Sequence, residues 1–349
     1  MSQAFPKSLV LDVGHSWTKA FLIQNDKNKL LLERYSSVPT TIGDLSIAAN
    51  TLLKDLKVAK GTNLIVTGAL PETETLAKNL SATYTTQEEA ESAFRKYLEK
   101  NGMKKSVILD TGEYSYANNL KISHIGAFLT FDASENDIEN YFGNKSLKPE
   151  SVPTSPQELE IEEAFYRVAF SQNREFIASP NVVNVIITGA LLPLLPKQAK
   201  IALIILDILA KGRIAQVKLD SHQFLHGFGA LLKTYPEIGE WENDFWQPLG
   251  SFVSFGGKGR IMLDYGFTEN QELNIVEDEI ALIPAPKEQQ VEITLLDLKD
   301  KPHFSVSGGA FGVLLDGRVK PLKLGFGRAD SRDAMKRWLS AIDKVEVIG

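Results

Sequence analysis

The chain has 349 residues, of which 43% are hydrophobic and none is cysteine. This length and composition predict a globular protein of more than one domain, and the lack of cysteine excludes disulfides, thiolate metal ligands and a cysteine nucleophile. The formal net charge is -6 and no basic stripe is visible, which argues against binding to nucleic acid. Neither a signal peptide nor a transmembrane segment is indicated, so we expect a cytoplasmic protein.

The N-terminal part predicts three strands followed by helix, strand, helix, strand and helix. Apolar periodicity and turn residues place these elements at 8–13, 18–24, 29–35, 43–56, 63–66, 72–79 and 83–85, with the last helix from Thr86 to Asn101-Gly102. Thr86 and Glu89 have the spacing of a capping box. Asn101-Gly102 is typical of a left-handed helix end.

The same order of elements is predicted to recur from residue 106. The expected strands are 106–110, 114–122 and 125–131, and a polar stretch from Asp132 leads to a helix capped by Ser155, with Pro156 in its first turn and Glu158 as capping-box partner. A strand at 182–187, a helix at 197–211, a strand at 214–218 and a helix at 221–232 follow. Asp-x-Gly follows the first strand of both halves, and TGAL occurs at 67–70 and 188–191. We therefore predict two duplicated α/β lobes that face each other across a cleft.

The C-terminal part has a different pattern. Residues 247–327 alternate short apolar segments with glycine and proline, which predicts a small β-barrel or β-sandwich module. A final helix is expected from Asp330, with Met335, Trp338, Leu339 and Ile342 on its buried side. The predicted domains are thus two lobes, 1–105 and 106–240, and a β-rich module with a terminal helix, 241–349.

The turn DVGHSWTK after the first strand contains residue types that bind phosphate. Successive backbone N–H groups at a tight turn form an anion-binding nest, to which hydroxyl groups and a lysine add donors and charge. An aspartate at a strand end suits magnesium, which keeps several of its waters. A plain hairpin with a turn aspartate is the alternative interpretation. The candidates here are Asp12, Gly14, Ser16, Thr18 and Lys19.

Two later turns extend this hypothesis. In LDTGEYS, Asp110 would hold a metal or position a water, and Thr111, Gly112 and Ser115 would donate to a γ-phosphate. In ITGALLP, Gly189 would let the backbone pass a base or ribose. Ordinary strand-ending turns remain the alternative for both. The two glycines of LHGFGALL (225–232) predict close packing against a lobe or a ligand.

At these turns the sequence resembles the actin-like ATPase superfamily. DVGHSWTK is similar to its phosphate-1 loop, LDTGEYS to its phosphate-2 loop, IITGALLP to its adenosine loop and HGFGALL to its second connecting segment. The resemblance covers about residues 8–232. Within that superfamily, ENYFGNKSLKPESVPTSPQELEIEEAFYRVAF (139–170) and SGGAFGVLLDGRVKPLKL (307–324) resemble the glutamate mutase L family.

This resemblance implies a duplicated, ribonuclease H-like α/β fold with ATP and Mg²⁺ as cofactors. It implies that Asp12 and Asp110 are the catalytic and metal-binding residues. The implied nucleotide contacts are Gly14, Ser16, Thr18, Lys19, Thr111, Gly112, Ser115, Thr188, Gly189 and Ala190. Such proteins are thought to act as ATP-driven chaperones of adenosylcobalamin-dependent mutases, which implies a protein partner and allows a homo-oligomer.

Three functions are compatible with the sequence. The first is an accessory or reactivating factor that binds ATP and hydrolyses it slowly. The second is a non-hydrolysing scaffold, filament subunit or adaptor, favoured by the residues Glu113 to Tyr116, which replace the second glycine and following residues of the family's phosphate-2 loop. The third is a small-molecule kinase, ranked last because no substrate motif is visible.

Overall fold

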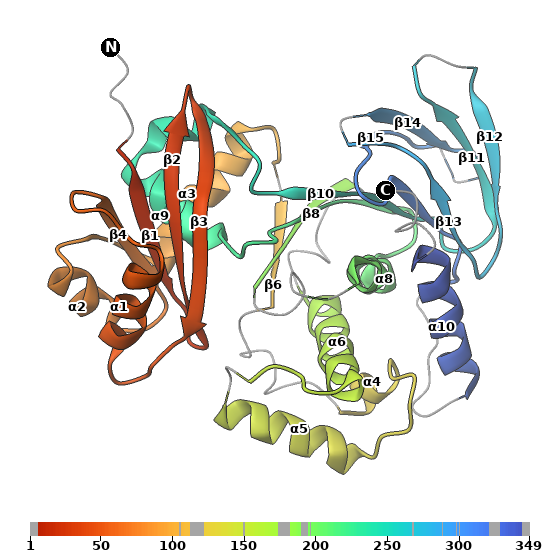
Figure 1. Ribbon diagram of the computed structural model, residues 1–349. Coiled ribbons are helices and arrows are strands. Elements are labelled where there is room, and N and C mark those ends of the chain that lie inside the picture. Colours follow the sequence, from red (N-terminus) through yellow and green to blue (C-terminus); the bar gives the residue numbers. More distant parts are fainter. Residues whose placement is uncertain are drawn as a thin grey trace.

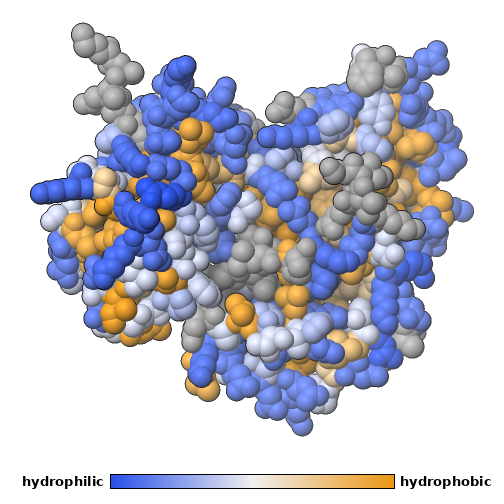
Figure 2. Space-filling model, viewed as in Figure 1, coloured by the Kyte–Doolittle hydropathy of each residue, from blue (hydrophilic) through white to orange (hydrophobic). Residues whose placement is uncertain are grey.

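Three β-sheets organise the molecule (Figure 1). The structure is a computed structural model, which describes residues 6–104, 106–111, 122–148, 151–173, 182–189, 195, 197–266, 269–287, 289–297, 299, 301–320 and 329–343. Within these residues no helix is both long and apolar enough to span a membrane. Figure 2 shows hydrophilic side chains over most of one face, with a notch at the lower edge between the part built on the first sheet and the part that carries helix α5 (Glu135–Leu147).

The first sheet confirms the predicted N-terminal strands. Its strands, in order across the sheet, are β5 (Thr83–Thr86), β4 (Asn63–Gly68), β1 (Ser8–Val13), β2 (Trp17–Asp26), β3 (Lys29–Pro39) and β9 (Glu242–Asn243). β1, β4 and β5 are parallel, whereas β2 is antiparallel to both β1 and β3. The short connections from β1 through β3 allow this meander, and the parallel strands are joined through helices.

Helices cover both faces of the first sheet. α1 (Leu45–Asp55) and α2 (Thr73–Asn79) pack on the face that includes Leu9 and Leu11. α3 (Gln87–Lys100) and α9 (Leu225–Thr234) pack on the face that includes Val10. Successive side chains of β1 point to opposite faces of the sheet, so Leu9 and Leu11 belong to one hydrophobic core and Val10 to the other. The predicted capping box of α3 is confirmed, because the Glu89 N–H donates to Thr86 Oγ1 at 3.1 Å and the Thr86 N–H donates to Glu89 Oε2 at 3.2 Å.

The second sheet is built from residues far apart in the sequence. Its order is β13 (Ile280–Ile283), β16 (Val313–Asp316), β10 (Gln247–Ser254), β8 (Arg213–Leu219), β7 (Val182–Thr188) and β6 (Ser106–Asp110). β6, β7 and β8 are parallel. One face shares a core with α6 (Pro156–Ser171), α8 (Gln198–Ile208) and α10 (Ala329–Asp343), and α4 (Ile122–Gly126) and α5 contribute to the same core.

The third sheet covers the other face of the second. Its order is β12 (Gln271–Ile275), β11 (Gly259–Asp264), β14 (Gln290–Leu295) and β15 (His303–Ser307). A common core joins it to residues of β8, β10, β13 and β16. The segment predicted to be a β-rich module therefore forms this small sheet and also completes the second one. The domain limits remain a prediction.

α9 and α3 lie between the first and second sheets. Their hydrophobic core includes Phe228 of α9, Phe94 of α3 and Ile186 of β7. The helices cross at Gly229, where an added Cβ would lie 2.1 Å from the backbone oxygen of Ala90. The close packing predicted for LHGFGALL is confirmed, and on this side the predicted cleft is filled by side chains.

A buried ion cluster ties α6, α8 and β16 together. Arg318 lies 2.6 Å from Asp207 and 2.7 Å from Asp316, and Arg167 lies 2.7 Å from Asp207. The side chain of Trp338 on α10 stacks over the Arg318 guanidinium, 4.6 Å from ring centroid to Cζ. Each buried charge faces an opposite one, so removing one member of the cluster would leave an uncompensated buried charge.

Three predictions for the second half were wrong. The segment 125–131 is not a strand: its first residues belong to α4, and a short apolar run does not by itself distinguish strand from helix. The polar stretch after Asp132 contains α5, whose capping box pairs Ser134 with Asp137. Glu158 accepts from the Thr154 N–H at 2.6 Å instead of completing a box with Ser155, although Ser155 is the N-cap. The predicted strand 114–122 lies outside the described residues, except for Ile122, which begins α4.

Candidate functional site

The β1–β2 hairpin places Asp12 and Lys19 side by side. Asp12 is the register partner of Lys19, and Val13 is the register partner of Thr18. Because side chains alternate along a strand, Asp12 and Lys19 share the face covered by α3 and α9, whereas Thr18 belongs to the opposite face. There the buried Thr18 hydroxyl lies 3.0 Å from Thr40 Oγ1. The hairpin thus brings together two of its five predicted residues and separates Thr18 from them.

Thr40 holds the tip of this hairpin. Its hydroxyl donates to the Gly14 carbonyl at 2.8 Å, and its N–H donates to the Ser16 carbonyl at 2.9 Å. An added Cβ on Gly14 would lie 2.9 Å from the Trp17 carbonyl oxygen, so a glycine is needed to close the turn. Sequence reasoning missed Thr40, because it lies 26 positions from Gly14 and only the β2–β3 pairing brings it close.

Asp12 belongs to a polar row across the parallel strands. Its register partner on β4 is Thr67, and the register partner of Thr67 on β5 is Thr85. Asp12 is 4% exposed and Thr67 is fully buried. Among the described residues the buried Thr67 hydroxyl has no hydrogen-bond partner. Leaving a buried hydroxyl without a partner costs stability.

The second sheet repeats this arrangement. Asp110 is the register partner of Thr188, as Asp12 is of Thr67. Asp110 is the last residue of β6 and Asp12 the last but one of β1, and both threonines begin a TGAL segment within the last two residues of the middle strand. The Thr111 N–H and hydroxyl both donate to the Thr188 carbonyl, at 3.0 and 2.9 Å. The correspondence predicted from the two echoes is therefore present in the strand registers.

Asp220 is a site residue that sequence reasoning missed. It follows β8, and its fully buried carboxylate accepts from Thr188 Oγ1 at 2.8 Å, from the Phe224 N–H at 2.9 Å and from the Leu225 N–H at 2.8 Å. The last two donors belong to the first turn of α9. The signal that could have revealed Asp220 is its position directly after the third strand of the triplet, whose first two strands end at Asp110 and Thr188.

Burial raises the pKa of Asp220, and the hydrogen bonds from Phe224, Thr188 and Leu225 oppose that rise, as does, to the smallest extent, the positive charge of Lys19. Asp220 lies at the carboxyl end of a parallel strand, where ligands of open α/β sheets bind.

Several predicted residues lie outside the described part of the chain: Gly112, Ser115 and Ala190, together with Glu113 to Tyr116. Gly189 is described, and its φ of +97° explains why a glycine follows β7. Among the described residues no group of three or more His, Cys, Asp or Glu side chains could hold a metal ion. Asp12 supplies one carboxylate, and one or two carboxylates are what a largely hydrated magnesium ion takes from a protein.

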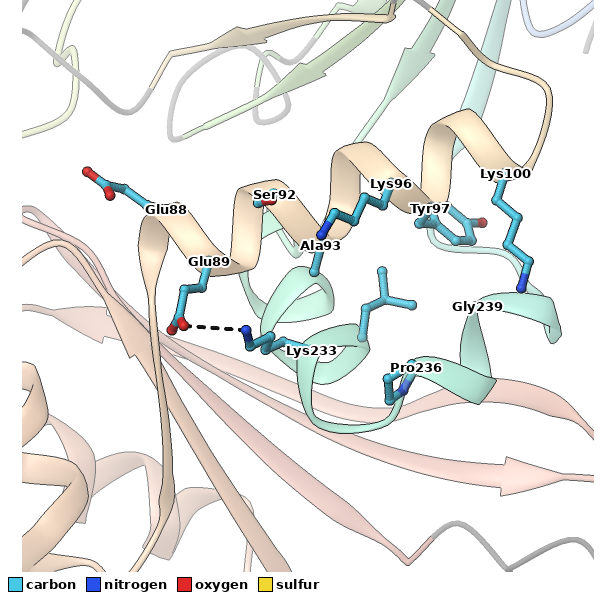
Figure 3. A pocket seen from close by; sticks show the side chains of 11 residues that line it. Glu88, Glu89, Ser92, Ala93, Lys96, Tyr97, Lys100, Lys233, Pro236 and Gly239 are labelled. Atoms are coloured by element: carbon cyan, nitrogen blue, oxygen red, sulfur yellow. Dashed lines mark ion pairs between the residues drawn. The ribbon is translucent and has the colours of Figure 1, made fainter.

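A separate surface pocket of about 480 Å³ lies between α3 and the segment formed by α9 and the 3-10 helix η3 (Pro236–Glu240) (Figure 3). Lys96, Tyr97 and Lys100 of α3 line one side of it. Lys233 lines the other and forms an ion pair with Glu89 at 3.4 Å. None of the sequence-predicted site residues lines this pocket.

Comparisons with known proteins give distant structural matches only. No protein-family model and no curated protein matches the chain. The activator of the 2-hydroxyisocaproyl-CoA dehydratase from Clostridium difficile, solved with bound ADPNP, is similar with a TM-score of 0.39 and 13% identity, over 67% of this chain and 96% of that one. A Ppx/GppA family member from Aquifex aeolicus is similar with a TM-score of 0.27 and 14% identity, over 69% and 94% of the two chains.

Both matches lie below 25% identity and below a TM-score of 0.5. At such scores and identities they do not assign a function to this chain. Membership of the glutamate mutase L family remains a prediction.

Proposed function

We propose that this protein binds ATP or ADP together with magnesium at the ends of β1 and β6. The observation that carries the proposal is the position of Asp12 near the end of β1, where it is 4% exposed and is the register partner of Lys19. Its other register partner is Thr67, whose buried hydroxyl has no hydrogen-bond partner among the described residues. A cation would compensate the buried negative charge, and a phosphate group would compensate Lys19.

The two halves would hold different parts of the ligand. Asp12 would bind magnesium through its hydration shell, and Lys19 would contact phosphate oxygens. The bound magnesium would neutralise phosphate charge. In the second half, Asp110 would face the terminal phosphate and Gly189 would let the backbone approach the nucleoside. Asp220 holds the side chain of Thr188 and the first turn of α9 in place.

Nucleotide binding at this junction would act on both sheets. Asp12 and Lys19 belong to the first sheet and Asp110 to the second, while α9 packs between the two. Binding across such a junction changes the relative stability of open and closed arrangements. We propose that this change serves a partner enzyme, such as a cobalamin-dependent mutase, as an accessory or reactivating factor.

The alternative is a non-hydrolysing scaffold or adaptor, which the sequence Glu113 to Tyr116 favours. A carboxylate at position 113 would repel a terminal phosphate. The two functions differ in a phosphate-release assay with Mg-ATP. Turnover above the no-enzyme rate supports the first, and nucleotide binding without turnover supports the second.

Isothermal titration calorimetry with ATP and with ADP, each with and without magnesium, tests the binding proposal. Lys19→Ala should weaken Mg-ATP binding by about 10- to 100-fold, because a charge-assisted contact is lost. Asp12→Asn should remove most of the dependence on magnesium. Lys27→Ala is the matched control, because Lys27 is an exposed lysine in the turn that follows β2. Binding that ignores both magnesium and Lys19, or no binding by the wild type, would overturn the proposal.

A further inference from the structure

We propose that the surface pocket between α3 and the segment formed by α9 and η3 binds a small organic anion with one carboxylate head and an apolar body. The pocket is separate from the ends of β1 and β6, so this proposal does not depend on nucleotide binding. Its volume of about 480 Å³ is within the range typical of sites for small organic ligands. Because it lies at the surface, a ligand can enter it without separating the sheets.

One part of the pocket wall is apolar. Ala93 of α3, Leu232 of α9, and Pro236 and Gly239 of η3 contribute to it. Figure 3 shows the Ala93 side chain directed into the pocket. A Cβ on Gly239 would lie 3.3 Å from Leu232 Cδ2 and 3.7 Å from Tyr97 Cδ2, so the glycine keeps space free beside two lining side chains. This wall suits the apolar body of a ligand.

Tyr97 gives the pocket a fixed side. Its hydroxyl accepts a hydrogen bond from Asn243 Nδ2 at 3.2 Å. Its ring meets the ring of Phe228 edge-on, with the centroids 5.2 Å apart, and stacks on Phe94 at 5.9 Å. Since these contacts hold the ring in the free protein, binding costs little in ordering this wall.

Three lysines surround the apolar part: Lys96 and Lys100 on α3, and Lys233 on α9 (Figure 3). Lys100 lies 2.6 Å from Glu240, and Lys233 lies 3.4 Å from Glu89. Within the described part of the chain, Lys96 forms no ion pair. A ligand with one negative charge would supply the counter-charge that Lys96 lacks.

The spacing of Lys96 and Lys100 also favours an anion. They are four residues apart on one helix, where like charges repel each other and destabilise the helix. Glu88, the other lining carboxylate of α3, points away from the pocket in Figure 3. Because two of the three lysines already have a carboxylate partner, a single negative charge matches the pocket better than a phosphate dianion.

The experiment measures binding of octanoate to the ligand-free protein by isothermal titration calorimetry. Octanoate should bind with a dissociation constant below about 1 mM. Octanamide has the same chain without the charge and should bind about 3- to 10-fold more weakly, the effect of one charge-assisted hydrogen bond. Acetate has the charge without the chain and should bind at least about 10-fold more weakly.

Lys96→Ala should weaken octanoate binding by the same factor of about 3 to 10 and leave octanamide binding unchanged. Lys54→Ala is the matched control, because Lys54 is an exposed lysine of helix α1 that does not line the pocket. It should bind octanoate as the wild type does.

Ala93→Leu tests the apolar wall. The larger side chain occupies the space that the octanoate chain needs, so the affinity should fall by at least about 10-fold. Gly239→Ala narrows the same pocket from the side of η3 and replaces Ala93→Leu if circular dichroism shows that leucine disturbs the fold.

Lysine acetylation followed by mass spectrometry locates the bound anion. Octanoate should slow the acetylation of Lys96 and leave that of Lys54 unchanged. The proposal is overturned if octanoate does not bind saturably, if octanamide binds equally well, or if Lys96→Ala or the pocket-filling variant keeps the wild-type affinity. None of these results bears on nucleotide binding at the ends of β1 and β6.

Discussion

The substitution Gly229→Ala tests whether the α3–α9 crossing sets the distance between the two sheets. In a helix interior with free space around the residue, replacing glycine by alanine raises the free energy of unfolding by about 1 kcal/mol. At position 229 the new Cβ would lie 2.1 Å from the Ala90 carbonyl oxygen and 2.6 Å from its carbon, where ordinary contact begins at 3.4 Å. Both obstacles are backbone atoms, so the helices must separate by more than an ångström.

Overpacking of this kind costs about 1–3 kcal/mol, and backbone obstacles favour the upper part of that range. The cost outweighs the gain in helix propensity, so we expect a net loss of about 1–2 kcal/mol. The shift would also loosen Phe228 against Phe94, whose ring centroids are 6.3 Å apart, and Trp246 against Phe228, at 5.8 Å.

The assay is urea unfolding followed by circular dichroism and tryptophan fluorescence. Gly143→Ala in α5 is the matched control: it is the same substitution in a helix interior, but nothing lies within 4 Å of the new Cβ. It should gain about 0.5–1 kcal/mol. If Gly229→Ala were as stable as Gly143→Ala, the close crossing and the reasoning built on it would be refuted.

Two further predictions concern buried charge and helix capping. Arg318→Met should lower the free energy of unfolding by about 3–5 kcal/mol at neutral pH, because it leaves Asp316 and Asp207 short of a cation. The same change at Arg260, which is half-exposed, should lower it by less than about 1 kcal/mol. Burial works to raise the pKa of Asp316, but the charges and hydrogen bonds of Arg318 and Lys320 hold it below its usual value. This carboxylate therefore stabilises the fold above its unfolded pKa of about 3.9, and its contribution is lost as the pH falls through the lower folded value. The loss of stability caused by Arg318→Met should accordingly become smaller in acid. A loss that becomes larger in acid would contradict the lowered pKa of Asp316. Thr86→Ala should lower the free energy of unfolding by about 1 kcal/mol, because it removes the N-cap of α3. A free energy of unfolding equal to that of the wild type would show that the cap is dispensable.

The local elements of the first half were predictable from sequence because their signals are short-range. Alternation identifies β1 to β3, and the capping box fixes the start of α3 through residues only three positions apart. The strand-ending Asp12 and Asp110, and the TGAL segments after β4 and β7, could likewise be located in the sequence. Their equivalence in the two sheets followed from the repeated order of elements.

Short-range signals failed where tertiary packing chose between alternatives. The apolar segment that begins at Ile125 can serve as strand or helix, and its burial beneath α6 decides for a helix and a turn. The strands β10, β13 and β16 have the alternation of an independent β-module, yet they pair with β8 and with one another in the second sheet. Nothing in a local pattern specifies which sheet a strand joins.

The sequence by itself determined which residues could serve a phosphate site: an aspartate, a lysine and small residues at the end of a strand. Only the tertiary structure decided which of them share a face. Strand register put Asp12 beside Lys19 and Thr67 and put Thr18 on the other face, and it aligned Asp110 with Thr188 at the end of the second parallel triplet. The physical reason is that side-chain direction follows from pairing between distant strands, and such pairing is fixed by burial of the whole core.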